Sequence, residues 1–262
     1  MDLAIVIPAY NDPRLERCLK SIDEDVEVVV VLNGATPEIK RIAKSHPVRI
    51  RELDEPNLSR AYNEGILSAA SSNVLIMDSD CVFEPGTIRS LYRLLDEAPL
   101  AKGRVVFAYR SFIGKTVARA RHIHTTRKNA YSPPLAFRKS IVNKIGNYYF
   151  DAELKWTEDF DFDARVQRAK LPIAYEHSAK VIHPELTLRQ DLRSAFHYGT
   201  GHARGVIKQK TGYGRLGKMW AGLPKLYSLI KKKYGAATAS YYVVWQISFW
   251  LGYKKQMRRM SL

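Results

Sequence analysis

The sequence predicts an α/β fold in which a mostly parallel central sheet is flanked by helices and followed by a basic helical C-terminal extension. Through the first hundred residues, short apolar runs alternate with segments of helical periodicity, which is the pattern of parallel strands joined by crossover helices. The chain has 262 residues and is 46% hydrophobic, so it can bury a sizeable core. Beyond residue 187 only helical patterns remain, and acidic residues almost disappear.

Four apolar runs in the first hundred residues are predicted to be buried strands: residues 3–8, 26–32, 48–52 and 74–77. The segments between them carry helix signals. Apolar residues recur at helical spacing from Leu15 to Ile22, and Pro37 suits the first turn of a second helix. Ser59 is expected to cap a third helix, and Pro85 to open a fourth that ends at Leu95.

The pattern changes after Pro133 to a mixture of strands and helices. A strand is expected over Leu135–Phe137, and Thr157 is expected to open a helix. A further strand near Val181 should end at His183. The predicted organisation is therefore a first domain over residues 1–187, with halves 1–100 and 101–187, and a helical extension over residues 188–262.

The net charge of +16 is concentrated in the C-terminal part of the chain. Residues 171–262 carry 16 Lys and Arg against 3 acidic residues, and no acid follows Asp191. A second acid-free stretch runs from Ala98 to Phe150. Such fields attract anions, which makes a nucleic acid, an anionic membrane surface or a phosphorylated substrate the expected class of partner.

The segment Gly235–Tyr253 has no charged residue and lies between clusters of Lys and Arg. Its length is close to the roughly 20 residues that a helix needs to cross a bilayer. Its Gln, Ser and Thr residues and its many aromatics favour an amphipathic or interfacial helix instead. A helix buried in a protein core is the alternative.

Two features bear on the compartment. Cys18 and Cys81 lie far apart, without the spacing of a disulfide framework or a zinc site, so a reducing compartment is expected. The N-terminus lacks the basic start and long apolar stretch of a signal peptide. We therefore expect a cytoplasmic protein, with peripheral contact to the inner face of the membrane through the C-terminal segment.

Polar residues follow the predicted strands, at the edge where ligands bind in open parallel sheets. The strand ends carry Tyr10-Asn11-Asp12, Asn33-Gly34, Asn57 and Asp78-Ser79-Asp80. Neither a G-x-G-x-x-G turn nor a Walker-type loop is present. A different kind of nucleotide site is therefore needed if the ligand is a nucleotide.

Three acidic or basic elements could carry chemistry, and each also has a structural explanation. Asp78 and Asp80 follow a buried strand and could hold a divalent cation that bridges two phosphates, although paired acids also occur in solvated turns. Glu158 and Asp159 could simply stabilise a helix N-terminus. His183 ends a strand, where a lone histidine is more often structural than a metal ligand.

Taken in order, these elements resemble family 2 glycosyltransferases of the GT-A fold. The resemblance covers about residues 1–187. It is carried by the following segments: Ile5-Val-Ile-Pro-Ala-Tyr-Asn11, Asn33-Gly34, Asn57-Leu-Ser-Arg-Ala-Tyr-Asn63-Glu-Gly65, Asp78-Ser-Asp80, Leu135-Ala-Phe-Arg138, Thr157-Glu-Asp159 and His183. The Q-x-x-R-W of processive synthases is missing, so processive synthesis is not expected.

The resemblance implies a nucleotide-diphosphate sugar as donor and a role for each matching residue. The residues implied to bind the donor are Pro8, Tyr10, Asn11, Asn33, Asn57, Arg60, Asn63 and Asp78. A Mn or Mg ion would be held by Asp80, with Asp78 and His183 as further ligands. Asp159, with Glu158 beside it, would be the base of an inverting single displacement. Asn33 stands where an aspartate is commoner, which leaves the nucleotide base open.

Two other functions remain as alternatives. A nucleic-acid-binding protein would account for the basic tail but not for acids at strand ends, and no nucleic-acid motif is present. A sugar-nucleotide nucleotidyltransferase would share the fold but usually carries a glycine-rich loop after the first strand. The two acid-free stretches favour an anionic or lipid-linked acceptor, and nucleic acid is not an expected partner.

Overall fold

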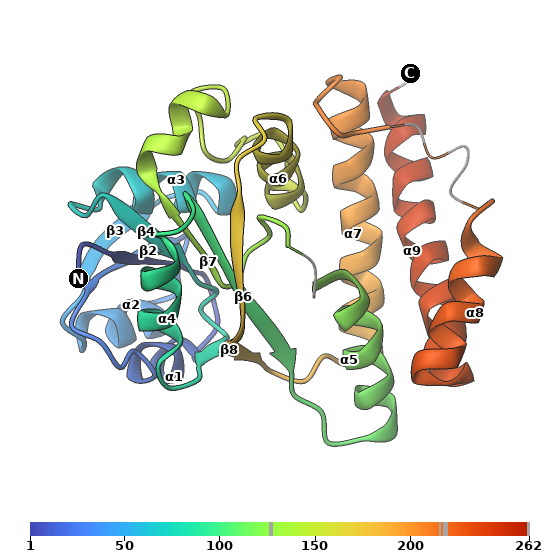
Figure 1. Ribbon diagram of the computed structural model, residues 1–262, viewed down its shortest axis with the longest axis horizontal. Helices are drawn as coiled ribbons and strands as arrows, with labels where there is room; N and C mark the ends of the chain where they lie inside the picture. The colour runs from blue at the N-terminus through green and yellow to red at the C-terminus, as the bar shows by residue number, and fades with distance from the viewer. Residues whose placement is uncertain (126–127, 215, 217–219, 261–262) are drawn as a thin grey trace. The chain divides into compact units, whose positions relative to one another are not determined.

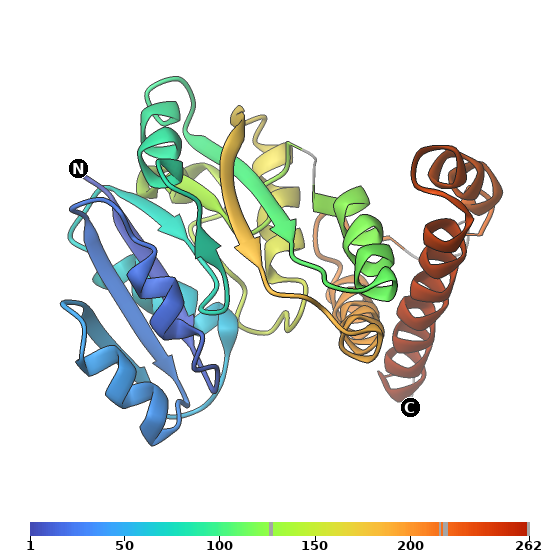
Figure 2. The ribbon, with the colours of Figure 1, turned by 90° about the horizontal axis from the view of Figure 1, so that it is seen from below.

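The computed structural model describes residues 1–125, 128–214, 216 and 220–260 (Figures 1 and 2). The chain forms two compact units that interleave along the sequence. Unit 1 consists of Met1–Val106 and Arg127–His183, and unit 2 consists of Phe107–Thr126 and Pro184–Leu262. The domain boundary predicted at residue 187 stays a prediction, as do the two halves of the first domain.

Unit 1 begins with the predicted parallel sheet. Its four N-terminal strands are β1 (Ala4–Ala9), β2 (Glu27–Asn33), β3 (Arg49–Leu53) and β4 (Asn73–Ile76). They pair in parallel in the order β3-β2-β1-β4, with Val6 beside both Val29 and Ile76. The strands are rich in β-branched residues, and β1 is buried along its whole length, as expected for a strand covered on both faces.

The second half of the sheet is antiparallel. It contains β5 (Val82–Phe83), β6 (Leu100–Phe107), β7 (Leu135–Arg138) and β8 (Ile173–His183), and the whole sheet has the order β3-β2-β1-β4-β7-β6-β8-β5. The pairs β4–β7, β6–β7 and β5–β8 are antiparallel. The expected strands at 135–137 and up to His183 are thus present, whereas β6 was not predicted.

Helices cover both faces of this sheet (Figure 1). They are α1 (Leu15–Lys20), α2 (Pro37–Lys44), α3 (Leu58–Ser68), α4 (Thr87–Leu94), the 3-10 helix η1 (Lys139–Lys144) and α6 (Glu158–Arg168). One face packs against α3, η1 and α6 in a core that includes Val6, Tyr62, Phe137 and Phe162. The opposite face of β2 contacts α2, and the alternation of side chains along each strand supplies both layers.

Two predicted helix starts were wrong by one or two residues. The N-cap of α3 is Asn57, whose Oδ1 accepts a hydrogen bond from the backbone N–H of Arg60 at 3.1 Å, while Ser59 lies buried inside the first turn. Asparagine is as good an N-cap as serine, so the sequence alone did not separate the two. Helix α4 is preceded by Gly86 at a φ of 75° rather than opened by Pro85.

Unit 2 is helical in its described residues. Its helices are α5 (Phe112–Thr125), α7 (Leu188–Ile207), α8 (Leu223–Tyr234) and α9 (Ala236–Met260). The most extensive helix–helix contact is between α7 and α9, which lie side by side in Figure 1. A Cβ atom at Gly199 would come 1.9 Å from the carbonyl oxygen of Phe249, and one at Gly252 equally close to that of Phe196. Glycine at both positions therefore lets the two helix backbones touch.

The charge-free segment predicted at 235–253 forms most of α9. One side of this helix is buried through Tyr241, Tyr242 and Trp245. The side chains of Val244, Ile247 and Leu251 are 46%, 41% and 49% exposed. Among the described residues, no helix is both long enough and apolar enough to cross a membrane.

A buried ion pair joins the helices of unit 2. Asp191 on α7 is 0% exposed. Its carboxylate accepts hydrogen bonds from Nε of Arg121 on α5 and from the hydroxyl of Tyr241 on α9, both at 2.5 Å. The guanidinium of Arg121 also lies 5.4 Å from the ring centre of Tyr198. One acid thus connects three helices.

We expect Asp191→Ala to destabilise unit 2 by about 3–5 kcal/mol, because it leaves the Arg121 guanidinium buried without its partner. Thermal or urea unfolding followed by circular dichroism measures the change. Glu185→Gln is the control, since Glu185 is an acid of the same unit that is only half-buried and accepts a hydrogen bond from Ser111 at 3.2 Å. Equal stability of the two variants would contradict a structural role for the Asp191 cluster.

Candidate active site

The carboxyl ends of the parallel strands of unit 1 place the predicted site residues along one edge of the sheet. Tyr10 and Asn11 follow β1, Asn33 ends β2, and Asp78 to Asp80 follow β4. The short strand β5 directly follows Asp80 and Cys81, and it pairs with Val181 and Ile182 near the end of the long strand β8. This pairing brings His183, the last residue of β8, to the loop that carries Asp80. The sheet topology therefore brings the D-x-D element and the strand-final histidine together.

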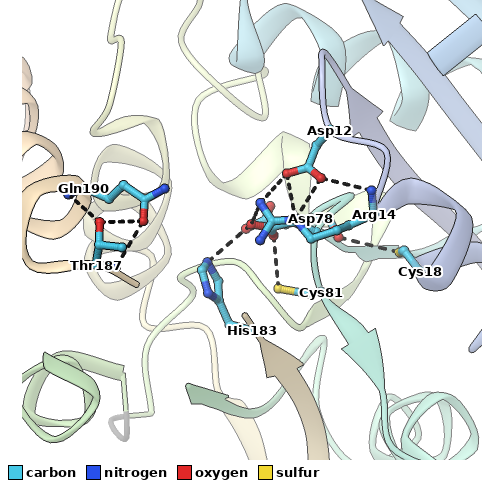
Figure 3. A network of polar contacts seen from close by, with 9 residues as sticks. Asp12, Arg14, Cys18, Asp78, Cys81, His183, Thr187 and Gln190 are labelled. Carbon is cyan, nitrogen blue, oxygen red and sulfur yellow. Dashed lines mark hydrogen bonds and ion pairs between the residues drawn. The ribbon is translucent and has the colours of Figure 1, made fainter. Parts of the chain in front are cut away.

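Figure 3 shows this cluster from close by, with Asp12, Arg14, Asp78, Cys81 and His183 labelled. Asp80 is its centre, because both of its carboxylate oxygens have partners in the cluster. Its Oδ2 lies 3.6 Å from Nε2 of His183 and 3.5 Å from a guanidinium nitrogen of Arg14. Arg14 is held in turn by Asp12, whose carboxylate accepts from both its backbone N–H and its side chain. The Arg14 guanidinium and the His183 imidazole thus both lie beside Oδ2 of Asp80.

Cys81 lies on the other oxygen of Asp80. Its Sγ is 3.5 Å from Oδ1, and ligand atoms of Asp80, Cys81 and His183 lie within 4.8 Å of one another. Burial raises the pKa of the Cys81 thiol well above its usual range, and Asp78 and Asp80 raise it further. The thiol therefore donates to Asp80, and its soft sulfur suits a Mn or Mg ion less well than the carboxylate beside it.

Asp78 has a separate set of contacts. Its Oδ1 accepts a hydrogen bond at 2.8 Å from the hydroxyl of Tyr62, a buried residue of α3, and its backbone carbonyl accepts from Cys18 Sγ at 3.6 Å. Burial raises the pKa of Asp78 to about 6, with Asp80 adding to the rise. Asp78 is thus oriented by the protein, whereas both oxygens of Asp80 lie toward groups that could exchange for a ligand.

Glu158 and Asp159 open α6 as predicted. Thr157 occupies the N-cap position, but its side chain accepts no capping hydrogen bond from the helix. Burial raises the pKa of Glu158 to about 8, with Asp159 as the next cause, and raises the pKa of Asp159 to about 6. Burial therefore makes both adjacent carboxyls hold their protons more tightly than an exposed carboxyl does.

Three asparagines predicted to bind the donor have partners within the protein. Asn33 Oδ1 accepts from the backbone N–H of Asn57 at 2.7 Å, and Asn57 Nδ2 donates to the carbonyl of Ala152 at 2.9 Å. Asn63 exchanges two hydrogen bonds with the backbone of Phe150, at 2.8 and 3.0 Å. These side chains fix the chain around the site, and their predicted contact with a donor remains a prediction.

The other predicted donor residues differ in exposure. Pro8 is buried within β1, whereas Tyr10, Asn11 and Arg60 are exposed and could reach a ligand without rearrangement of the core. Arg14 and Lys102 were not predicted. Arg14 is one of many basic residues and follows Pro13, so nothing in the sequence singled it out. Lys102 could have been noticed in the sequence, because it is a charged residue within the otherwise largely apolar segment Leu100–Phe107.

The family of the chain follows from its match to a protein-family model. The model described as "Glycosyl transferase family 2" matches residues 4–155, more than half of the chain. The chain is a family 2 glycosyltransferase. The match covers the strand ends, the D-x-D element and α3, and it stops three residues before the acidic pair of α6. The resemblance seen in the sequence is thereby confirmed.

Curated relatives of this family 2 glycosyltransferase align over about a third of its length. Glycosyltransferase GlyA of Streptococcus pneumoniae is 30% identical over 105 residues, which are 36% of this chain and 15% of GlyA. An uncharacterized glycosyltransferase of Mycobacterium tuberculosis, Rv0539, is 27% identical over 104 residues, 39% of this chain and 48% of the relative. The alignment thus spans less than half of either relative.

Solved structures extend the likeness to the whole chain. The mannosyltransferase PcManGT of Pyrobaculum calidifontis superposes with a TM-score of 0.64 at 18% identity, covering 100% of this chain and 88% of PcManGT. Residues 1–349 of TarS from S. aureus superpose with a TM-score of 0.56 at 16% identity, covering 99% of this chain and 92% of that one. The glycosyltransferase therefore has the GT-A fold with C-terminal helices, as the sequence predicted.

Proposed function

We propose that this glycosyltransferase moves a sugar from a nucleotide-diphosphate donor to an acceptor hydroxyl in one metal-dependent displacement that inverts the anomeric carbon. The observation that carries the proposal is the Asp80 carboxylate, which meets the His183 imidazole at the carboxyl edge of the sheet. Asp78 also interacts electrostatically with the acidic residues that open α6, since its charge contributes to the raised pKa of Glu158.

The donor class is supported by two structural neighbours. TarS has been solved with UDP-GlcNAc, and PcManGT with GDP-Man and Mn2+. Both donors are nucleotide-diphosphate sugars, and both proteins share this fold. We infer that the same class of donor lies across the strand ends here, against Pro8, Tyr10 and Asn11, with Asn33, Asn57, Arg60 and Asn63 around it and Asp78 toward the ribose.

The donor atoms at Asp80 fit a Mn or Mg ion. A hard divalent ion prefers carboxylate oxygen and accepts an imidazole as a further ligand. Asp80 and His183 would hold it, with Asp78 next to them, and the soft sulfur of Cys81 is not among the ligands that we propose. When bound, the ion neutralises the charge that builds up on the departing diphosphate. Arg14, 3.5 Å from the same carboxylate, would compete with the ion for Asp80.

Asp159 is proposed as the base. Its raised pKa of about 6 leaves it ionised at neutral pH yet basic enough to take the proton of an acceptor hydroxyl as that oxygen attacks the anomeric carbon. In such a single displacement the acceptor attacks from the face opposite the leaving diphosphate, so the configuration inverts.

Thermal-shift measurements with nucleotides test the donor class. UDP, GDP and TDP are each added with Mn2+, and the base that raises the melting temperature most names the donor group, because a ligand that binds the folded state stabilises it by mass action. A ligand present at a hundred times its Kd adds about 2.7 kcal/mol. No stabilisation by any nucleotide diphosphate would overturn the proposal.

We further propose that the acceptor is anionic or lipid-linked and that unit 2 contacts an anionic membrane surface from the cytoplasmic side. The support is the exposed apolar stripe of Val244, Ile247 and Leu251 on α9, whose spacing puts the three side chains on one helix face. The same face continues to the exposed Lys254 and Arg258. An apolar stripe that ends in basic residues is typical of interfacial helices.

Liposome co-sedimentation should detect this contact. We expect binding to vesicles that contain anionic lipid, weakening with salt, and a loss of about fivefold for each of Lys254→Gln and Arg258→Gln, since a basic residue near anionic lipid contributes about 1 kcal/mol. Replacing Val244, Ile247 and Leu251 by serine should reduce binding further. Leu58→Ser with Leu67→Ser, two exposed leucines of unit 1, is the control. Binding to an oligonucleotide but not to anionic vesicles would favour the nucleic-acid alternative.

A further inference from the structure

Arg14 is an arginine that reaches from the loop after β1 toward the D-x-D element (Figure 3). It occupies the N-cap position of α1. One of its guanidinium nitrogens lies 3.5 Å from Oδ2 of Asp80, the oxygen that His183 also approaches, at 3.6 Å. The guanidinium therefore stands beside the carboxylate oxygen that is proposed to bind the ion.

Asp12 holds Arg14 in this place. Its Oδ1 accepts hydrogen bonds from the backbone N–H of Arg14 at 3.0 Å and from Nε at 2.8 Å. Its Oδ2 accepts from Nε at 3.0 Å and from a terminal guanidinium nitrogen. Such a two-pronged pair fixes the plane of the guanidinium as well as its position. Because Asp12 lies two residues away in the same loop, this hold does not depend on Asp80.

The contact between Arg14 and Asp80 is looser than the contact with Asp12. At 3.5 Å it is longer than the roughly 2.7–2.9 Å of a charge-assisted hydrogen bond. The two side chains are 42% and 22% exposed, and an ion pair in such a partly exposed place shifts an equilibrium by about fivefold at most. Asp80 can therefore exchange Arg14 for another cation at little cost, while Asp12 keeps the guanidinium close by.

We propose that Arg14 is a second cation for the donor diphosphate, which pairs with Asp80 when no ion is bound and with the diphosphate when Asp80 binds the ion. The inference rests on the proposed metal at Asp80. A diphosphate that shares an ion with Oδ2 of Asp80 has to approach that oxygen, and this brings it within reach of the guanidinium. Arginine suits the role, because its planar fork donates two parallel hydrogen bonds to phosphate oxygens.

This role gives Arg14 opposite effects on two ligands. Toward the ion alone, Arg14 competes for Asp80, so it weakens binding. Toward a nucleotide diphosphate that arrives with the ion, Arg14 is an additional partner, so it strengthens binding. Ion and nucleotide then bind better together than singly, which is a positive coupling. An arginine that only held its loop through Asp12 would, on removal, weaken the binding of both ligands.

The test measures both affinities with the full chain. Binding of Mn2+ alone is followed by electron paramagnetic resonance of the free ion, and binding of UDP, GDP and TDP at saturating Mn2+ by calorimetry. Arg14→Gln should bind Mn2+ alone about fivefold more tightly, because the competing ion pair is lost. It should bind the nucleotide that binds the wild type at least about tenfold more weakly, because a charged hydrogen-bond donor to phosphate is lost. Arg17→Gln, the same charge change at an exposed position of α1, should alter neither affinity by more than about twofold.

Arg14→Lys covers the case in which Arg14→Gln does not fold. It keeps the charge but loses the fork, so nucleotide binding should weaken while the affinity for Mn2+ alone stays within about twofold. For either variant, unchanged affinity for the nucleotide or weaker affinity for Mn2+ alone would overturn the inference, as would unchanged affinity of Arg14→Gln for Mn2+. If the wild type binds neither Mn2+ nor a nucleotide diphosphate, the proposed metal fails as well. If the wild type binds both and the Arg14 variants do not separate the two affinities, only the role of Arg14 fails.

Discussion

Replacing Asp159 by asparagine should lower the rate of sugar transfer by a factor of roughly 10²–10⁴ while nucleotide-diphosphate binding stays nearly unchanged. Asparagine keeps the shape of the side chain and can still accept the hydrogen bond that Asp159 Oδ1 takes from the N–H of Phe160 at 2.7 Å. It cannot accept the proton of an acceptor hydroxyl. Single-turnover assays with the donor identified by thermal shift, together with calorimetry of donor binding, separate the two effects.

The same assay has a pH signature. Because burial raises the pKa of Asp159 to about 6 and only the ionised form can act as a base, transfer should fall tenfold for each pH unit below that value. Asp54→Asn, a change at an exposed acid of the same unit, should leave rate and pH profile as they are. Near-normal turnover by Asp159→Asn would leave this residue as a stabiliser of the α6 N-terminus only.

Removing the Asp80 carboxylate should abolish the dependence of nucleotide-diphosphate binding on divalent ions. With the wild-type chain, a chelator should weaken binding at least about tenfold, because Asp80 and His183 then have no ion through which to reach the diphosphate. In Asp80→Ala the affinity should be equally low with and without Mn2+. Calorimetry in both conditions measures it.

Two outcomes would contradict this metal assignment. One is equal wild-type affinity with and without chelator. The other is unchanged, Mn2+-dependent affinity in Asp80→Ala. Because Arg14 lies 3.5 Å from the same carboxylate, Asp80→Ala also frees this guanidinium, and residual binding that does not respond to Mn2+ is consistent with the prediction.

The parallel strands and the polar residues at their carboxyl ends could be predicted from the sequence. The antiparallel second half of the sheet could be predicted only in part. Strands such as β1 are apolar and β-branched, so their ends, and the polar residues after them, could be located without a structure. The approach of His183 to Asp80 depends on the antiparallel pairing of β8 with the two-residue strand β5, which is too short to give a periodic signal. The family resemblance, rather than spacing, pointed to His183.

Other parts of the site could not be predicted because they depend on long-range contacts. Asn57 and Asn63 were assigned to the donor, and the structure gives them backbone partners at Ala152 and Phe150. A polar side chain next to a motif does not reveal whether its partner is a ligand or a distant stretch of backbone. Lys102 has the same property: its partners lie about thirty residues further along the chain.

The interleaving of the two units also constrains how the protein is made. Helix α5 leaves the ribosome before β7, α6 and β8, yet it packs on α7 and α9, through Val117 and Ala120 against Ala195, Tyr241 and Trp245. Domains usually fold as units during synthesis, and here the GT-A sheet can be completed while α5 still exposes its apolar face. Nascent chains that end before α9 should therefore be the ones that bind chaperones, and a shortened chain that stops near residue 187 should inherit the same exposed helix.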